Sequence, residues 1–476
     1  MEKLTIENLS FCYQKNDSKV LNDLNLKLPD GTMNLLFGPS GCGKSTLMKI
    51  IAGLYPEYAG HVLSGTINFN EQSTENWTTR DIAKHIAILF QNPTDQFSMT
   101  TVKQEFIFTL ENLGYPRQQM DQRIQHALER LDIAHFIDRR LDSLSGGELQ
   151  KVSLAITLAM DCDLIILDEP FACIDLKSRQ QLLKLLKDLQ VNDGKTILVS
   201  DHDLMGYQDI IDNLFHFQAG QIVKVNDTQH IFQRYQKANQ SLQFSLPEKS
   251  ESIVDLCNLQ LKNGQKPLIT DSSLEFSNGK LILLTGENGS GKSAFFSALT
   301  KLHDYSGLIE YQHKNIQKYN SRKYARQIGL VFQDAQMQYL KLTLQEEIDL
   351  SLKHTRYQDF WTKKRVKDYL QLLHLDHLRE HIVYQLSGGQ KKKLQIFEML
   401  ILGNPVLLLD EPLSGLDLDS TKAVMEMIKS IASQQSQTIV MISHQLGGLN
   451  GFFDYHLQLA DQKLSYTEVL NYESIS

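Results

Sequence analysis

The chain has 476 residues, of which 42% are hydrophobic and 22% charged, a composition typical of a folded protein with two domains. Its formal net charge of −8 argues against a protein that mainly binds nucleic acid, because such proteins usually carry a basic excess. The five cysteines form no CxxC pair, which fits free thiols in a reducing cytoplasm and excludes a zinc or iron–sulfur framework. The first ten residues lack the apolar core of a secretion signal. No apolar run approaches the roughly 18 residues of a membrane span, so a role at a membrane requires other subunits.

The first half of the chain has the pattern of an α/β domain. Residues 32–37 are an apolar run, which predicts a strand, and they lead through the glycine-rich stretch 38–45 into a helical pattern. Residues 102–140 have a mostly helical pattern and predict a separate helical lobe. DLIILDEP (163–170) and KTILVSDH (195–202) are apolar runs ending in polar side chains, typical of buried parallel strands whose carboxyl ends bind ligands.

The second half of the chain repeats this order. Lys292 follows Lys44 after 248 positions, and LSGGQ at 386–390 follows LSGGE at 144–148 after 242. A deletion of six residues after the first loop explains the change of spacing. Self-similarity over this distance indicates two tandem copies of one domain.

The copies predict a first domain at 1–225 and a second at 251–476, joined by a linker at 226–250. The linker is polar and rich in glutamine. Its spacing favours a short helix at the start, and Pro247 favours an extended connector after it.

Two glycine-rich loops carry the chemistry. GPSGCGKS at 38–45 and GENGSGKS at 286–293 both match the G-x-x-x-x-G-K-[ST] phosphate loop. Its glycines let backbone N–H groups turn toward a phosphate at the positive end of the following helix. Lys44 and Lys292 would reach the terminal phosphates, and the serine after each lysine offers a hydroxyl to Mg²⁺. One match could be a chance turn, but two matches followed by the same later motifs exclude that alternative.

Acid pairs end two of the predicted strands. Asp168 and Asp410 would lie near the metal, and Glu169 and Glu411 could polarise an attacking water. Surface acids at strand ends are the alternative, but they do not explain why both strands end in the same acid pair before a proline.

Small residues begin a further helical pattern in each copy. Ser145-Gly-Gly and Ser387-Gly-Gly offer N–H groups and a hydroxyl to an anion at a helix start. Each domain would then have two phosphate-binding helix starts but one nucleotide loop, and pairing of the two domains resolves the excess. The lysines at 391–393, within the second of these patterns, are interpreted as a solvated helix face.

Each half resembles an ATP-binding-cassette ATPase, and the resemblance covers nearly the whole chain. It implies the α/β class, with two tandem P-loop NTPase domains, each a RecA-like parallel-sheet core with a helical lobe. It further implies that the cassettes pair head to tail within one chain around two ATP molecules, with Mg²⁺. Gln91 and Gln333 match the family's glutamine loop, which senses Mg²⁺ and the γ-phosphate and touches the transmembrane partner. His202 and His444 match its switch histidine.

The resemblance implies three groups of site residues. Catalysis would depend on Glu169, Glu411, His202, His444, Gln91 and Gln333. Mg²⁺ would be held by Ser45, Gln91, Asp168, Ser293, Gln333 and Asp410. The nucleotides would be bound by Tyr13, Gly38, Pro39, Ser40, Gly41, Cys42, Gly43, Lys44, Ser45, Thr46, Ser145, Gly146, Gly147, Glu148, Gly286, Glu287, Asn288, Gly289, Ser290, Gly291, Lys292, Ser293, Ala294, Ser387, Gly388, Gly389 and Gln390.

The head-to-tail pairing of the family implies which residues share each ATP. Lys44 and Ser45 would face residues 387–390, while Lys292 and Ser293 would face residues 145–148. The residues matching the family's interface aspartate are Asp175 and Asp417.

The two copies differ around the expected nucleotide. Tyr13 stands where the family stacks an aromatic ring on adenine, although it could instead pack at a strand end. A gap-free alignment places Leu261 opposite it, and Ala294 replaces Thr46. We therefore expect both sites to hydrolyse ATP and the Lys292 site to bind it more weakly.

The segment QNPTDQF at 91–97 resembles the energy-coupling factor ATPases, whereas its counterpart QDAQMQY at 333–339 departs from that pattern. Those importers take up vitamins or transition-metal ions, using two ATPases, an integral membrane scaffold and a substrate-binding membrane subunit. The resemblance implies a peripheral protein at the cytoplasmic face of the cell membrane, without nucleic acid, serving a vitamin such as thiamine or its pyrimidine precursor.

Two alternatives remain open. One is a soluble tandem-cassette ATPase acting on ribosomes, a type that usually carries a long charged linker. The other is a sugar-type import ATPase, in which one cassette commonly has a decayed catalytic set.

Overall fold

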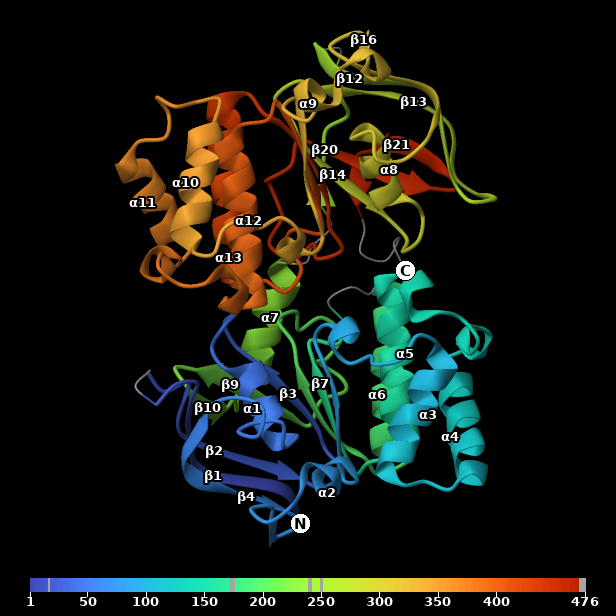
Figure 1. Ribbon diagram of the computed structural model, residues 1–476, viewed down its shortest axis with the longest axis vertical. Helices are drawn as coiled ribbons and strands as arrows, with labels where there is room; N and C mark the ends of the chain where they lie inside the picture. Colours follow the sequence, from blue (N-terminus) through green and yellow to red (C-terminus); the bar gives the residue numbers. More distant parts are fainter. Residues whose placement is uncertain (16–17, 172–175, 239–241, 249–250, 471–476) are drawn as a thin grey trace. The chain divides into compact units, whose positions relative to one another are not determined.

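The computed structural model in Figure 1 forms two compact units, Met1–Tyr235 and Gln236–Ser476. Each unit contains its own sheets and its own hydrophobic clusters. The residues that the structure describes are 1–15, 18–171, 176–238, 242–248 and 251–470.

The first unit contains both strands and helices. Its strands are β1 (Glu2–Cys12), β2 (Leu21–Pro29), β3 (Met33–Phe37), β4 (His61–Phe69), β5 (Gln72–Ser73), β6 (Ile86–Leu89), β7 (Leu164–Asp168), β8 (Thr196–Ser200), β9 (Asn213–Gln218) and β10 (Gln221–Lys224). Its helices are α1 (Lys44–Ile51), α2 (Thr79–Ala83), α3 (Val102–Leu113), α4 (Arg117–Arg130), α5 (Gly146–Ala159), α6 (Leu176–Val191) and α7 (Thr228–Ala238), the last of which extends past the unit boundary.

The second unit repeats the same order of elements. Its strands are β11 (Leu242–Gln243), β12 (Ser252–Asn263), β13 (Lys266–Ser277), β14 (Leu281–Gly286), β15 (Ser306–Tyr311), β16 (Lys314–Asn315), β17 (Ile328–Val331), β18 (Val406–Asp410), β19 (Thr438–Ile442), β20 (Tyr455–Ala460), β21 (Lys463–Thr467) and β22 (Val469–Leu470). Its helices are α8 (Lys292–Leu299), α9 (Ser321–Tyr324), α10 (Leu344–His354), α11 (Lys363–Leu372), α12 (Gly388–Leu402) and α13 (Leu418–Gln435).

The central sheet of each unit is mainly parallel. Its order is β10-β9-β3-β8-β7-β6 in the first unit and β17-β18-β19-β14-β20-β21 in the second. Every residue of β3, β7 and β8 is buried, as expected for apolar strands covered on both faces. The predicted parallel core is therefore confirmed, with an antiparallel edge strand, β10 or β21, that the sequence analysis did not include.

A smaller antiparallel sheet accompanies each core, in the order β2-β1-β4-β5 or β13-β12-β15-β16. Buried and exposed residues largely alternate along β2, the pattern of a strand with one face toward the core. The buried face packs with α1 and the central sheet in one hydrophobic cluster. The apolar pattern of the sequence does not separate these strands from the parallel core.

The predicted helical lobes are present in both units. Figure 1 shows α3, α4 and α5 side by side in the first unit, and α10, α11 and α12 in the second. Matching capping boxes begin α3 at Thr101 and α10 at Thr343, where the side chains of Gln104 and Glu346 bond back to the cap.

The region predicted as a linker, 226–250, is packed at both of its described ends. A helix does form at its start, α7, and Phe232 on this helix is buried in the hydrophobic cluster of the first unit. Leu242 of β11 is buried in the cluster of the second unit, and β11 pairs with β22. The described parts of this region thus belong to the two units.

The pairing register of the antiparallel sheets corrects one alignment. Phe11 pairs with Leu21 in the first unit, and Leu261 pairs with Ile269 in the second. Leu261 therefore occupies the place of Phe11, and its expected alignment with Tyr13 is wrong. The physical reason is a shorter strand connection: ten positions separate Phe11 from Leu21, but eight separate Leu261 from Ile269.

Candidate nucleotide-hydrolysis sites

The first phosphate loop joins buried β3 to α1. Gly43, the residue before the helix, has φ 114°, a left-handed conformation that side chains rarely tolerate. The Lys44 Nζ donates to the carbonyl oxygens of Gly38 at 2.8 Å and Pro39 at 3.1 Å. The ammonium is thus held over its own loop, where the N–H groups at the start of α1 favour an anion.

The second loop has the same geometry. Gly291 has φ 111° before α8, and the Lys292 Nζ donates to the carbonyls of Gly286 at 2.8 Å and Glu287 at 2.9 Å. Both loops therefore have the form of a phosphate cradle, and both lysines are buried.

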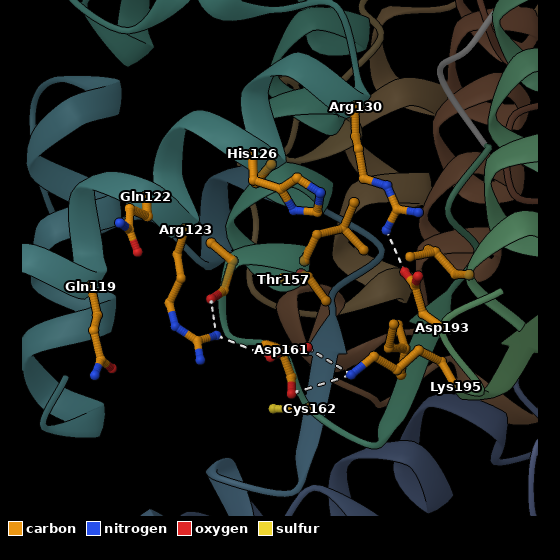
Figure 2. A pocket seen from close by; sticks show the side chains of 15 residues that line it. Gln119, Gln122, Arg123, His126, Arg130, Thr157, Asp161, Cys162, Asp193 and Lys195 are labelled. Carbon is orange, nitrogen blue, oxygen red and sulfur yellow. Dashed lines mark hydrogen bonds and ion pairs between the residues drawn. The ribbon is translucent and has the colours of Figure 1, made fainter.

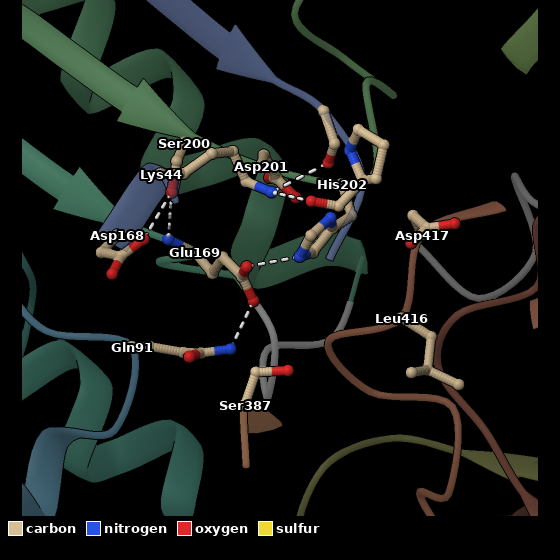
Figure 3. Close-up of polar contacts among 12 residues, drawn as sticks. Lys44, Gln91, Asp168, Glu169, Ser200, Asp201, His202, Ser387, Leu416 and Asp417 are labelled. Atoms are coloured by element: carbon tan, nitrogen blue, oxygen red, sulfur yellow. Dashed lines mark hydrogen bonds and ion pairs between the residues drawn. The ribbon is translucent and has the colours of Figure 1, made fainter. Parts of the chain in front are cut away.

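Asp168 lies at the carboxyl end of β7, fully buried, next to the first loop (Figure 3). The Ser200 hydroxyl donates to its Oδ1 at 2.6 Å, and the Ser45 hydroxyl also hydrogen-bonds this carboxylate. Burial, followed by the nearby charge of Glu169, raises the pKa of the Asp168 carboxyl. Oxygen atoms of a carboxylate and a serine hydroxyl fit Mg²⁺, whose charge would favour the ionised form of Asp168.

Two side chains converge on Glu169 (Figure 3). The Gln91 amide donates to its Oε2, and the Nε2 of His202 forms an ion pair with its Oε1. Burial alone would raise the pKa of this carboxyl, but the charges of His202 and Lys44 and the hydrogen bonds outweigh it and lower the pKa. An ionised glutamate beside a histidine is suited to orient and polarise a water.

The corresponding site of the second unit is more open. Asp410 ends β18 and is hydrogen-bonded by Ser293, while burial and the charge of Glu411 raise its pKa. The Nε2 of His444 lies 3.5 Å from Glu411 Oε1, and its backbone N–H donates to Oε2 at 3.1 Å. The same set of groups is present, with a longer histidine–glutamate contact than in the first unit.

The helices that begin with Ser-Gly-Gly are capped differently. Ser145 donates its hydroxyl to the Glu148 carboxylate at 2.8 Å, so a negative charge already lies at the start of α5. At the start of α12, the neutral Gln390 accepts the Ser387 N–H at 2.9 Å. An incoming phosphate would meet a carboxylate only at Glu148.

On the side expected to hold adenine, the Tyr13 hydroxyl forms a 2.8 Å hydrogen bond with Thr46 Oγ1. The ring is 44% exposed and has edge contacts with Phe11 and Tyr55, which leaves ring surface open for stacking. The true counterpart of Tyr13 in the second unit is Asn263, at the end of β12, and it is exposed.

The interface aspartates are only partly described. Asp175 lies outside the described residues. Asp417 caps α13, where its side chain accepts the Ser420 N–H at 2.8 Å.

Two supporting residues were not predicted from the sequence. Ser200 ends β8, two residues before His202, and it lies beside Asp168 at the end of β7. That position could have indicated its role. The prediction that Lys392 belongs to a solvated helix face is wrong. Its Nζ donates to the backbone carbonyls of Gln333 and Glu411, while its neighbour Lys393 is buried.

A hollow of about 740 Å³ lies between the helical lobe of the first unit and the segments around β7 and α6 (Figure 2). Its charged groups are paired with one another: Arg123 and Lys195 with Asp161 at 3.3 and 2.7 Å, and Arg130 with Asp193. It lies near the start of β7, whereas the candidate site lies at the end of that strand. The hollow is therefore distinct from the nucleotide site.

Aromatic side chains stand at the corresponding positions of the second unit. Tyr369 stands where the first unit has Ala127, a residue that lines the hollow. Trp361 lies 6.0 Å from Tyr369 and 5.7 Å from Phe397 between ring centroids.

Together, the two loops, the strand-end acids and the flanking glutamines and histidines define a tandem P-loop ATPase. The ABC transporter family model matches residues 21–172 and 269–414, and the chain belongs to this family. Members of the family bind and hydrolyse ATP, so the chain is an ATP hydrolase with two cassettes.

Two relatives resemble the chain along nearly its whole length. A protein of Bacillus subtilis (strain 168), provisionally named as an HMP/thiamine import ATP-binding protein, is 33% identical, over 98% of this chain and 91% of its own length. A protein of Treponema denticola, provisionally named as an ABC transporter ATP-binding protein, is 30% identical, over 93% of this chain and 92% of its own.

Solved structures support the fold. A model of ribosome-bound archaeal Pelota and ABCE1 contains a chain with a TM-score of 0.71 and 19% identity, covering 98% of this chain and 79% of that one. A crystal structure of the archaeal ribosome recycling factor aABCE1 with a stalk protein has a TM-score of 0.63 and 19% identity, covering 95% and 87%. In the described parts of the chain, no helix has the length and apolar character needed to cross a bilayer.

Proposed function

We propose that this chain is the ATP-hydrolysing subunit of an energy-coupling factor importer, working from the cytoplasmic face of the cell membrane. Its membrane partners would be an integral scaffold and a substrate-binding subunit. Its cargo would be thiamine or the pyrimidine precursor of thiamine. The observation that carries the proposal is the end-to-end likeness to the Bacillus subtilis relative, whose name refers to HMP/thiamine import.

The residues proposed above act in two sites. Lys44, Ser45 and Asp168 would hold ATP and Mg²⁺ in the first site, with Glu169 and His202 orienting the attacking water. The equivalent residues of the second unit would do the same. By the family resemblance, each site is completed by the Ser-Gly-Gly helix of the other cassette. No nucleic acid takes part.

An exposed apolar surface supports docking to a partner. Four large apolar side chains are between 49% and 77% exposed. Met337, Leu340 and Leu342 follow Gln333, and Tyr384 lies in a later segment. The backbone N–H of Val383 donates to the Leu342 carbonyl at 2.9 Å, so the two segments lie together. Exposed apolar groups gathered in this way favour burial against another protein.

The first unit presents a different surface in the same region. Its segment 91–97 continues into a hollow of about 410 Å³ lined in part by Phe97, Met99, Leu141 and Leu149. We propose that a cytoplasmic helix of the scaffold docks here and that a more apolar helix docks on the second unit.

Ribosome action is the second candidate, because the two solved structures described above are ribosome-associated tandem ATPases. At 19% identity they support the fold alone. The importer is favoured because the relative named for import shares 33% identity across both cassettes.

The test is to tag the chain, solubilise native membranes in mild detergent and identify what copurifies. We expect two integral membrane proteins, one of them small and able to bind thiamine or its precursor. Leu340→Asp should reduce their recovery, while Leu302→Asp, a change at another leucine that is mostly exposed and lies outside this surface, should not. Recovery of ribosomal subunits, or of no membrane protein, would contradict the importer.

A further inference from the structure

A lysine links two catalytic segments in the second cassette. Lys392 lies in the first turns of α12. Its Nζ donates to the backbone carbonyl of Gln333, which lies two residues after the end of β17. The same ammonium donates to the carbonyl of Glu411 at 3.3 Å. One charged group thus ties the glutamine segment to the end of β18.

The hydrogen bond from Lys392 to Glu411 is made at a residue with an unfavourable backbone conformation. Glu411 has φ 48°, a left-handed backbone conformation that non-glycine residues adopt only when their surroundings hold them there. Its N–H donates to the Ile442 carbonyl at 3.1 Å, and its carbonyl accepts from Lys392. The peptide groups on both sides of this residue are therefore fixed, which orients its carboxylate.

The first cassette has an uncharged residue in this place. Gln150 occupies the position of Lys392, because both stand two residues after the last residue of LSGGE or LSGGQ. Gln150 is buried, and its Nε2 has no hydrogen-bond partner among the described residues. Glu169 also has a left-handed backbone, φ 49°, and there the side chain of Gln91 reaches the carboxylate directly.

Lys392 also changes the charge around the metal-binding carboxylate. Its ammonium acts electrostatically on Asp410, a contribution that the neutral Gln150 does not make on Asp168. The two cassettes therefore differ by one positive charge beside the same pair of acids.

We propose that Lys392 is a positioning residue for ATP hydrolysis in the second cassette. Its ammonium holds the backbone of Glu411 in place relative to that of Gln333. The Glu411 carboxylate and the Gln333 side chain can then contact the same water. The first cassette reaches this arrangement through the Gln91 side chain. The inference rests on the proposed catalytic roles of Glu411 and Gln333.

The experiment uses the full chain with Glu169→Gln, so that hydrolysis reports on the second site. Adding Lys392→Gln, which installs the residue of the first cassette, should lower kcat about tenfold, as expected for loss of charge-assisted hydrogen bonds. The KM for ATP and the affinity for ATP measured by calorimetry should change by less than about twofold, because the phosphate loop is untouched. Lys392→Arg should restore most of kcat.

Lys364→Gln is the matched control, since it removes an exposed lysine from the same lobe, and it should leave kcat unchanged. An unchanged kcat in Lys392→Gln would overturn the proposal. So would a loss explained by a lower melting temperature or not restored by arginine, because either points to a structural role alone. If the parent Glu169→Gln chain binds ATP but does not hydrolyse it, the proposed catalytic set of the second unit is wrong instead.

Discussion

The two cassettes differ in the side chains that surround the segments carrying His202 and His444. In the first, the buried Arg179 donates to Asp203 at 2.6 Å and to Asp201 at 3.4 Å, and the Tyr207 hydroxyl donates to Asp201 at 2.9 Å. Removing one partner from such a buried charged network leaves an uncompensated charge, which is strongly destabilising.

The second cassette fills the same positions with neutral groups. Thr421 replaces the arginine, and Gln445 donates to the Leu416 carbonyl at 2.9 Å and approaches Thr421 at 3.5 Å. His444 is nevertheless brought to Glu411. The difference teaches that the groups proposed to react are kept while the residues that hold them are exchanged, so that the rigidity and affinity of each site can be set separately.

The largest test of this comparison replaces the proposed catalytic acids. Glu169→Gln or Glu411→Gln should lower hydrolysis at its own site by roughly 10²–10⁴-fold, and the double variant should lose turnover entirely. Steady-state ATP turnover measures this.

ATP affinities measured on the two single variants then compare the sites. We expect the Lys292 site to bind ATP more weakly than the Lys44 site, and equal affinities would contradict this difference.

A second test concerns acid stability and His456, which is buried in β20 of the second unit. Its ring nitrogens contact the hydroxyls of Thr285 and Thr467, and burial lowers its pKa to about 4. The unfolded chain therefore binds a proton more readily, and this stability contribution, present above about pH 6.5, is lost as the pH falls toward 4. The loss should reach about 3 kcal/mol.

Hydrogen exchange, corrected for the intrinsic effect of pH, measures the loss in each cassette. The second should weaken between pH 6.5 and 4.5, and His456→Leu, which installs the Leu214 of the first cassette, should flatten that dependence. A dependence unchanged by the substitution would show that other groups cause it.

A third and smaller effect concerns adenine. Tyr13→Asn should weaken ATP binding at the first site about fivefold, because a stacking face worth about 1 kcal/mol is lost. Asn263→Tyr, the reciprocal change, should strengthen binding at the second site. Equilibrium titration of the Glu→Gln chains measures both, and an unchanged affinity in Tyr13→Asn would mean that the ring only packs at the strand end.

The smallest effect is a labelling rate. Burial raises the pKa of the Cys42 thiol despite the nearby Lys44, so N-ethylmaleimide should react slowly at pH 7 and faster as the pH rises. Mg-ATP should slow the reaction further. Ser290 holds this position in the second loop, so labelling should inhibit the first site alone. Mass spectrometry measures the modification, and a rate indifferent to Mg-ATP would exclude Cys42 from the nucleotide pocket.

The sequence predicted the parallel core and brought together the groups at its carboxyl edge. It could do so because Lys44, Asp168 and His202 each follow a short apolar run, and such runs form neighbouring parallel strands. These motifs encode local backbone geometry, such as the left-handed conformation at Gly43.

Long-range features were not accessible in this way. The contact of Lys392 with two carbonyls depends on where α12 packs, and a polar pattern along a helix looks the same whether its lysines are solvated or bonded. The shift between Tyr13 and Leu261 arose because a shortened turn between β12 and β13 leaves no mark in the apolar pattern of either strand.

The pairing of β11 with β22 has a consequence for engineering. Leu242 pairs with Leu470, so the first and last described strands of the second unit form one two-stranded ribbon. A module whose ends adjoin can be transplanted into a surface loop of a host protein, or reordered by circular permutation, without long spacers. A fluorophore attached at the exposed Val469 would lie beside Gln243 of β11, its pairing partner.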